Sequence, residues 1–295
     1  MFKKMIAFTL IFLLMFSIIG CNKEEKKVVI ASKPMTEQYV IAEMLKLLIE
    51  ENTDIKVELK LGIGGGTSNI QPAMEKGEID IYPEYTGTGW MFVLKQELIN
   101  NSEELYKSVK KAYEEQYGIK WTGLYGFNDT FGLAIKKELA DKLNIKTYSD
   151  LALKSDNLTL GAEYDFYERE DGYPGLSEIY GFKFDNKKEL DIGLKYQAIS
   201  TDQVDVINVF STDGRLKEKG LVVLQDDKNF FPSYFAATLV REETLKEYPQ
   251  LEEILEMMTG LISNEEMIEM NYLVEIEKKD PKQVAREFLE KKGLK

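Results

Sequence analysis

The chain contains no histidine and only one cysteine, Cys21, among its 295 residues. Without histidine, Ser–His and Cys–His nucleophilic catalysis, imidazole metal sites and the commonest general base at neutral pH are excluded. A single cysteine also excludes an intramolecular disulfide. Binding is therefore a better default interpretation of this sequence than catalysis, with no cofactor and no metal expected.

Familiar metal and phosphate motifs are missing too. No Asp-x-Asp-x-Asp-Gly loop that ends in Glu is present, so an EF-hand-like calcium site is not predicted. Residues 62–67 (Gly-Ile-Gly-Gly-Gly-Thr) lack the Gly-Lys-Ser/Thr ending of a phosphate loop and the third glycine of the dinucleotide fingerprint. A hydrolase that uses carboxylates stays open as an alternative, with Glu84, Asp129 or Glu163 as its acids.

Basic residues are outnumbered: 38 Lys and Arg stand against 51 Asp and Glu, for a net charge of -13. This acidity argues against a nucleic-acid partner, because no basic patch is available to neutralise phosphates. A hydrophobic content of 44% with 30% charged residues is ordinary for a globular protein. The length allows one large domain or two of moderate size.

The first residues are typical of a targeting segment. Lys3 and Lys4 precede an apolar stretch over residues 5–19, which is short for a membrane-spanning helix and suits a signal peptide. The sequence Ile-Ile-Gly-Cys at residues 18–21 resembles a bacterial lipobox. We therefore expect residues 1–20 to be removed, Cys21 to be lipidated, and residues 21–27 to tether the protein to the extracytoplasmic face of the cell membrane.

Residues 80–89 (Asp-Ile-Tyr-Pro-Glu-Tyr-Thr-Gly-Thr-Gly) are the stretch around which the rest of the chain is organised. Ile79 and Ile81 alternate with polar residues and predict a strand, which Pro83 should end because it lacks an N–H donor. The turn that follows places Tyr85 and Thr88 at the carboxyl edge of a sheet, where ligands bind in open α/β folds.

Strands and helices alternate over the first ninety residues, which predicts a mostly parallel sheet there, and the middle of the chain repeats this alternation, as in an α/β protein. The pattern predicts strands over residues 28–31, 57–61, 79–82, 158–162, 204–210, 221–224 and 236–240. It predicts a helix capped by Thr36, helices that begin at Thr67 or Ser68 and after Asn101, and others over residues 172–180, 190–199, 242–258, 264–276 and from 281 onward.

Residues 121–135 are extended at both ends with a turn between, and residues 230–240 lead from a loop into an apolar strand. We interpret the two segments as chain crossings between domains. The predicted organisation is a first lobe of residues 28–128 and 236–295, and a second lobe of residues 129–235.

Seven short motifs, in order, carry a family resemblance. They are Ser-Lys-x-x-Thr-Glu-Gln-Tyr at 32–39, Gly-Gly-Thr at 65–67, Tyr-Pro-Glu-Tyr-Thr-Gly-Thr at 82–88, Gly-Phe-Asn-Asp-Thr at 126–130, Arg-x-Asp-Gly at 169–172, Ser-Thr-Asp-Gly at 211–214 and Asp-Asp-Lys-x-Phe-Phe-Pro at 226–232. Together they resemble the substrate-binding proteins of ABC importers for glycine betaine, carnitine and choline. The resemblance implies a two-lobed periplasmic-binding-protein fold of type II, with the ligand between the lobes.

The resemblance also implies a binding site in which aromatic rings surround a quaternary ammonium group. The cage residues would be Tyr85, Phe131, Phe210 and Tyr234, with Tyr82, Tyr125, Tyr164 and Tyr167 as nearby alternatives. Thr88, Asp129 and Arg169 match polar positions of the family's site, and Arg169 would grip a carboxylate. Gln38 could add a hydrogen bond to that carboxylate.

This chain departs from the family at Phe131 and Phe210, where tyrosine is common. The phenylalanine rings keep their π faces but lose the hydroxyl groups, which leaves the choice of ligand open. We interpret the chain as a lipid-anchored, monomeric solute-binding subunit with a membrane permease as its partner. A binding protein for an amino acid or another polar solute, and a sensor domain of the same fold, are the alternatives.

Overall fold

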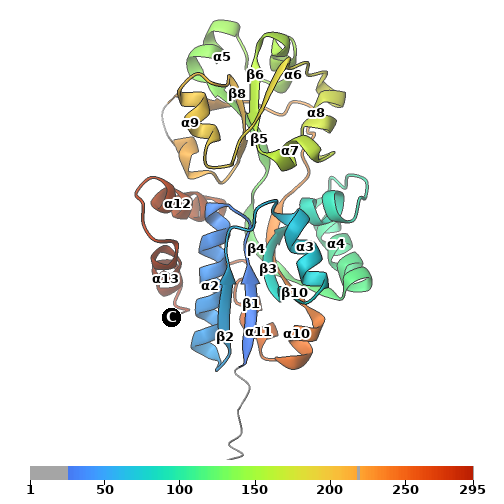
Figure 1. The fold of residues 1–295 in the computed structure, drawn as a ribbon, viewed down its shortest axis with the longest axis vertical. Helices are drawn as coiled ribbons and strands as arrows, with labels where there is room; N and C mark the ends of the chain where they lie inside the picture. The colour runs from blue at the N-terminus through green and yellow to red at the C-terminus, as the bar shows by residue number, and fades with distance from the viewer. Residues whose placement is uncertain (1–25, 218–219, 295) are drawn as a thin grey trace, which may run out of the picture.

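The computed structural model describes residues 26–217 and 220–294. Figure 1 shows two lobes, one above the other, with both the first and last parts of the described chain in the lower lobe and its middle in the upper one. The expected signal peptide, Cys21 and nearly all of the tether lie outside the described residues. Within those residues, no helix has the length and apolar character needed to span a bilayer.

The lower lobe is built on a mixed five-stranded sheet. Its strands, in spatial order, are β2 (Lys56–Lys60), β1 (Lys27–Ala31), β3 (Ile81–Tyr85), β10 (Phe235–Arg241) and β4 (Ile119–Asn128). β1 runs parallel to β2 and β3, whereas β10 is antiparallel to both β3 and β4. Strand β10, which comes from the last third of the chain, thus lies between β3 and β4 in this sheet.

The upper lobe has its own five-stranded sheet. The spatial order is β7 (Asn186–Glu189), β6 (Thr159–Ala162), β8 (Val206–Phe210), β5 (Phe131–Lys136) and β9 (Leu221–Val223). β6 is parallel to β7 and β8, and β5 is antiparallel to β8 and β9. Strands β5 and β8 pair so that Phe131 lies opposite Phe210.

Helices cover both sheets. In the lower lobe they are α2 (Thr36–Asn52), α3 (Thr67–Glu75), the π-helical turn η2 (Thr88–Val93), α4 (Ser102–Tyr117), α10 (Glu242–Glu247), α11 (Leu251–Glu256), α12 (Asn264–Glu275) and α13 (Pro281–Lys291). In the upper lobe they are α5 (Lys137–Leu143), α6 (Tyr148–Ala152), the short η3 (Ser155–Asn157), α7 (Tyr164–Glu168), α8 (Tyr173–Tyr180), α9 (Lys195–Ser200) and η4 (Gly214–Lys217).

The main core of the lower lobe forms around α2. Val40, Ile41, Met44, Leu45 and Leu48 recur at three- and four-residue spacing and are all buried. Helix α13 packs beside α2, as Figure 1 shows, so the C-terminal end of the chain completes the lobe in which it began.

The chain crosses between the lobes twice, as predicted. It leaves the lower sheet at the end of β4 and enters the upper sheet at β5, and it returns between β9 and β10. The fold is the two-lobed α/β architecture expected from the sequence. The lobe boundaries at 128/129 and 235/236 stay a prediction.

Strand β3 differs from the expectation, because it continues through Pro83 to Tyr85. The Pro83 carbonyl accepts a hydrogen bond from Gln38 Nε2 at 3.2 Å, on the side where β1 has already ended. The missing N–H points to that same side, so no ladder bond is lost to the neighbouring strand β10. The predicted turn at residues 87–89 is helical instead, as the start of η2.

Three helix predictions also need correction. Met35, not Thr36, is the N-cap of α2, with no side-chain cap. The helix predicted over 242–258 is split into α10 and α11 around Pro249, which interrupts helical hydrogen bonding. The helix predicted over 190–199 begins only at Lys195, because the Leu190 N–H still extends the unpredicted strand β7 by bonding to the Ala162 carbonyl at 2.9 Å.

Candidate functional site

A cleft of about 1010 Å³ is lined by residues of both lobes. Seven of the eight predicted ligand-binding residues line it: Tyr85, Thr88, Asp129, Phe131, Arg169, Phe210 and Tyr234. They come from the end of β3, the start of η2, both chain crossings, the end of α7 and the end of β8. The two crossings and the strand ends thus bring together residues that are far apart in the sequence.

Phe131 is the centre of an aromatic cluster at the first crossing. Its ring centroid lies 5.1 Å from that of Phe210 and 5.3 Å from that of Tyr234. Two further rings that the sequence did not single out, Phe166 and Phe231, lie at 5.5 and 5.6 Å. The antiparallel pairing of β5 with β8 explains why Phe131 and Phe210 meet.

Tyr85 and Tyr234 are far more buried than their turn-like sequence context predicts, with exposed fractions of 4% and 1%. The extension of β3 through Pro83 places Tyr85 in a strand, and the Tyr234 ring packs over Gly87. A Cβ at Gly87 would lie 2.7 Å from Tyr234 Cε1, so this position has no room for a side chain. Both tyrosines are therefore packing residues as well as cleft residues.

Arg169 is held in place by Asp171. Its Nε and Nη2 donate to the two carboxylate oxygens at 2.8 and 2.5 Å, and Nη2 also reaches Thr88 Oγ1 at 3.2 Å. Burial alone would raise the pKa of Asp171, but the charge and hydrogen bonds of Arg169 hold it below its usual value. Tyr234 donates to the same carboxylate at 2.7 Å. The two N–H groups of Nη1 do not donate to Asp171 or Thr88.

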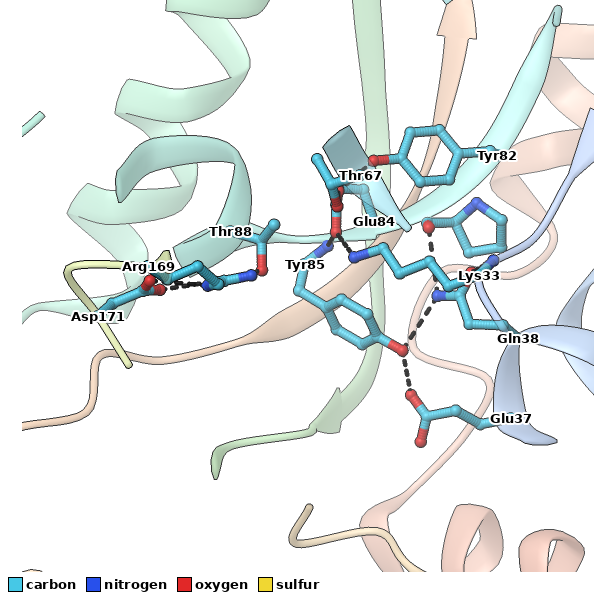
Figure 2. A network of polar contacts seen from close by, with 11 residues as sticks. Lys33, Glu37, Gln38, Thr67, Tyr82, Glu84, Tyr85, Thr88, Arg169 and Asp171 are labelled. Carbon is cyan, nitrogen blue, oxygen red and sulfur yellow. Dashed lines mark hydrogen bonds and ion pairs between the residues drawn. The ribbon is translucent and has the colours of Figure 1, made fainter. Parts of the chain in front are cut away.

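Next to Arg169 lies a second buried ion pair, between Lys33 and Glu84 (Figure 2). Lys33 Nζ lies 2.5 Å from Glu84 Oε1, and Thr67 donates to the other oxygen at 2.7 Å. Tyr82 also donates to that oxygen, and the backbone N–H of Tyr85 reaches Oε1 at 2.7 Å. Burial lowers the pKa of Lys33, and Glu84 opposes this effect.

Gln38 is the predicted site residue that does not line the cleft. Its Nε2 donates to the Pro83 carbonyl and, at 3.0 Å, to the Tyr85 hydroxyl, as Figure 2 shows. It is fully buried behind Tyr85. In this structure Gln38 positions the tyrosine ring, and its contact with a ligand carboxylate stays a prediction.

A contact between the lobes involves two acids and one hydroxyl. The Thr212 hydroxyl lies 2.5 Å from Glu37 Oε2 and 2.8 Å from Asp129 Oδ1. One hydroxyl has a single proton to donate, so one of the two carboxyl groups must itself carry a proton. Burial raises the pKa of Glu37 to about 7, with a further contribution from Asp213. Burial, Glu37 and Asp213 raise the pKa of Asp129 well above its usual range.

A second lysine lies behind the Phe210 ring. Lys195 is completely buried, and its Nζ lies 4.3 Å from the ring centroid and 3.6 Å from Glu163 Oε2. Neither of these two atoms has a hydrogen-bond partner among the described residues. Glu163 lines the cleft and accepts a hydrogen bond from Asn208 at 2.6 Å.

Sequence reasoning missed the roles of Lys33, Glu37 and Lys195. Lys33 and Glu37 belong to the Ser-Lys-x-x-Thr-Glu-Gln motif. The motif marks their positions in the sequence but does not predict the residues to which they bond. Nothing local marks Lys195. Among the alternative tyrosines, Tyr164 lines the cleft, whereas Tyr82, Tyr125 and Tyr167 bond to other protein groups.

The described residues contain no cluster of three or more acidic or cysteine side chains suited to a metal ion. Of the acids considered for a hydrolase, Glu84 is fully buried in the ion pair with Lys33.

Comparison with known proteins identifies the family. A family model described as the substrate-binding domain of ABC-type glycine betaine transport systems matches residues 26–291. The carnitine transport binding protein OpuCC of Listeria monocytogenes is 36% identical over 99% of this chain and 95% of its own length. A crystal structure of a glycine betaine/carnitine/choline ABC transporter protein has a TM-score of 0.71 at 34% identity, covering 90% of this chain and 98% of that one.

A second relative has a different ligand in its name. The ergothioneine transport permease/ergothioneine binding protein EgtU of Helicobacter pylori is 47% identical over 92% of this chain. This chain spans only 48% of that protein's length.

Proposed function

Because the chain belongs to the family of substrate-binding domains of ABC-type glycine betaine transport systems, we propose that it binds a solute with a quaternary ammonium group and a carboxylate. Its relatives and its fold are those of binding proteins, and the protein is not an enzyme. We propose that closure of the lobes over the ligand presents it to a membrane permease.

The aromatic cluster at the first crossing carries this proposal. Phe131, Phe210 and Tyr234 lie together in the wall of the cleft, and Tyr85 lines it as well. A quaternary ammonium group cannot donate a hydrogen bond, so ring faces are the protein groups that attract it best. Phe131 and Phe210 supply such faces without hydroxyl groups that would need partners of their own.

The cations beside the cluster support the carboxylate half of the proposal. Arg169 and Lys33 both line the cleft. In Arg169, Nη1 is not used by Asp171 or Thr88, and a guanidinium can bind a carboxylate while it keeps another partner. We assign the ligand carboxylate to Arg169, with Lys33 as the second positive charge nearby.

Two groups of ligands satisfy this chemistry. Glycine betaine and carnitine are the first, whereas choline has the quaternary ammonium group without the carboxylate and satisfies only half of this chemistry. Ergothioneine, a betaine of histidine with sulfur on its ring, is the second, and the EgtU relative favours it.

The expected setting of the protein completes the proposal. We propose that Cys21 carries the lipid anchor, that residues 1–20 are a signal peptide, and that the protein works as a monomer on the extracytoplasmic face of the membrane. The anchor and signal-peptide assignments rest on the sequence of residues 1–27, whereas the monomer is the default for a binding protein of this kind.

Isothermal titration calorimetry tests the ligand assignment directly. Purified protein without residues 1–20 is titrated with ergothioneine, glycine betaine, carnitine and choline. We expect a ligand with both groups to bind, and Arg169→Met to weaken its binding about tenfold to a hundredfold, as expected for a lost charge-assisted contact. Choline provides the control, since the same substitution should leave its binding within about threefold.

The outcomes separate the alternatives. Tightest binding of ergothioneine would identify the larger betaine, whereas tightest binding of choline would retain the aromatic site and reject the role of Arg169. Binding of an ordinary amino acid, with all four compounds inert in folded protein, would contradict the proposal.

A further inference from the structure

Three of the four predicted cage rings have a cation of the protein itself over one face. Lys33 Nζ lies 4.6 Å from the Tyr85 centroid, the Arg169 guanidinium carbon 5.3 Å from that of Phe131, and Lys195 Nζ 4.3 Å from that of Phe210. Each cation is also paired with a carboxylate, in Glu84, Asp171 and Glu163 respectively. At these three rings the protein therefore repeats one arrangement of ring, cation and acid.

Lys195 differs from the other two cations in its position. Lys33 and Arg169 line the cleft, so a ligand can touch them directly. Lys195 is completely buried and does not line the cleft, whereas Phe210 and Glu163 do. Lys195 can therefore influence a ligand only through the Phe210 ring or through the field of its charge.

The ion pair of Lys195 is also the loosest of the three. Its charged atoms lie 3.6 Å apart, against 2.5 Å in the Lys33–Glu84 and Arg169–Asp171 pairs. Lys195 Nζ and Glu163 Oε2 have no hydrogen-bond partner among the described residues, and the other oxygen of Glu163 accepts only the bond from Asn208 among the hydrogen bonds described above. More of each charge is felt at Phe210 than would be the case in a tight pair.

A cation behind a ring weakens the attraction of that ring for a cation in front. Ring faces attract cations through their quadrupole, and two positive charges on opposite faces repel each other in a buried site of low dielectric. A carboxylate beside the ring acts in the opposite sense. The net attraction of Phe210 for a ligand cation thus depends on the balance between Lys195 and Glu163.

We propose that Lys195 and Glu163 form an electrostatic pair that sets how strongly Phe210 attracts the quaternary ammonium of the ligand. Lys195 lowers the affinity for the cationic head group, and Glu163 raises it. Lys195 is a positioning residue that determines specificity for charge without touching the ligand. This inference rests on the proposed function, in which Phe210 faces the cation.

The test compares a ligand that has a cationic head group with an isostere whose head group is neutral. Glycine betaine and tert-butylacetate (3,3-dimethylbutanoate) have the same shape and the same carboxylate, and they differ in the replacement of the ammonium nitrogen by carbon. Dissociation constants for both are measured by calorimetry, directly or by displacement, with wild type, Lys195→Met, Glu163→Gln and the double variant. Lys228→Met is the matched control, because Lys228 Nζ lies 4.8 Å from the Tyr180 ring on the surface and outside the cleft.

The two single variants should change affinity in opposite directions. We expect Lys195→Met to tighten glycine betaine binding about threefold to tenfold and Glu163→Gln to weaken it by a similar factor, since a buried cation–π contact is of this order. The double variant should lie between them. Binding of tert-butylacetate should change less than about twofold in each, and Lys228→Met should change neither ligand.

A purely structural role would give a different pattern. Both single variants would then weaken both ligands, or leave the ratio of their affinities unchanged, and either result would overturn the inference. Thermal unfolding of each variant shows whether the fold is retained, and the double variant keeps the test valid if Lys195→Met alone is unstable. Wild-type protein that binds none of the proposed betaines would instead contradict the proposed function itself.

Discussion

Two buried polar clusters differ in their balance of positive and negative charge: the Lys33–Glu84 network and the Glu37–Thr212–Asp129 contact. Lys33 and Glu37 lie close together in the sequence, yet they belong to different clusters. Glu84 accepts hydrogen bonds from four groups, one of them a buried ammonium. Glu37 and Asp129 share the hydroxyl of Thr212, and the charged neighbours that raise their pKa values are acids. The Lys33–Glu84 network has one positive and one negative charge, whereas the Glu37–Asp129 contact has two acids, no cation among the bonds above, and at least one carboxyl group that needs a proton.

The two clusters also differ in position: one lies within a single lobe, and the other joins the two lobes. Lys33, Thr67, Tyr82 and Glu84 all belong to the lower lobe, so their network is retained whatever the lobes do. Glu37 begins α2 in the lower lobe, whereas Thr212 follows β8 in the upper one. The balanced network therefore stabilises the lower lobe, and the acidic one makes a contact across the cleft that depends on protonation.

Breaking the balanced network should have the largest effect. Lys33→Met removes the cation and leaves the Glu84 carboxylate buried, so we expect the free energy of unfolding to fall by about 3–5 kcal/mol. Chemical denaturation followed by circular dichroism measures this change.

The double variant Lys33→Met/Glu84→Gln is the control for that loss. It removes both charges and keeps an acceptor for Thr67, so most of the lost stability should return. A double variant less stable than Lys33→Met would show that the unpaired Glu84 carboxylate does not cause the loss of stability. It would contradict the conclusion that the balance of charge stabilises this network.

The acidic contact should respond to pH instead. The folded protein holds a proton at Glu37 up to a pKa of about 7, whereas the unfolded chain releases it near the ordinary value of 4.5. The folded state binds more protons in this interval, so stability is full below it and is lost as pH rises through about 7. Thermal unfolding at pH values from about 5 to about 8 should show this decline.

Glu37→Gln tests the source of the decline. Glutamine keeps the shape but cannot ionise, so the variant should be more stable than wild type near pH 8, by about 1–3 kcal/mol, and the two should converge near pH 5. An equal slope in both proteins would assign the pH dependence to other groups, among them Asp129 and Asp213.

Much of the fold followed from local patterns. Apolar spacing predicted α2 and the alternation of strands with helices, and the extended segments around residues 128 and 235 predicted the two crossings. The motifs that carry the family resemblance predicted seven of the residues that line the cleft. Helix α2 and the two crossings followed from spacing along the chain, whereas these site residues followed from the resemblance.

The charge partners could not be predicted in this way. Lys33 bonds to Glu84 across 51 positions, and Thr212 meets Glu37 across 175. Only the packing of strands and lobes determines such pairs, so Lys195 carried no local signal at all. The burial of Tyr85 and Tyr234 was missed for a related reason, since it depends on strand β3 passing through Pro83 at a sheet position where no N–H is needed.

Removal of the Tyr234 hydroxyl should have the smallest effect on stability among these substitutions. It donates to Asp171 at 2.7 Å, and that carboxylate keeps two bonds from Arg169 when the hydroxyl is removed. Tyr234→Phe should therefore lower the free energy of unfolding by about 1 kcal/mol, and ligand affinity should change by less than about threefold, because the ring face remains. Tyr234→Leu, which removes the ring, should weaken binding much more. Equal losses of affinity in the two variants would mean that the ligand bonds to the hydroxyl, and Tyr234 would then be a polar contact and not a wall of the cage.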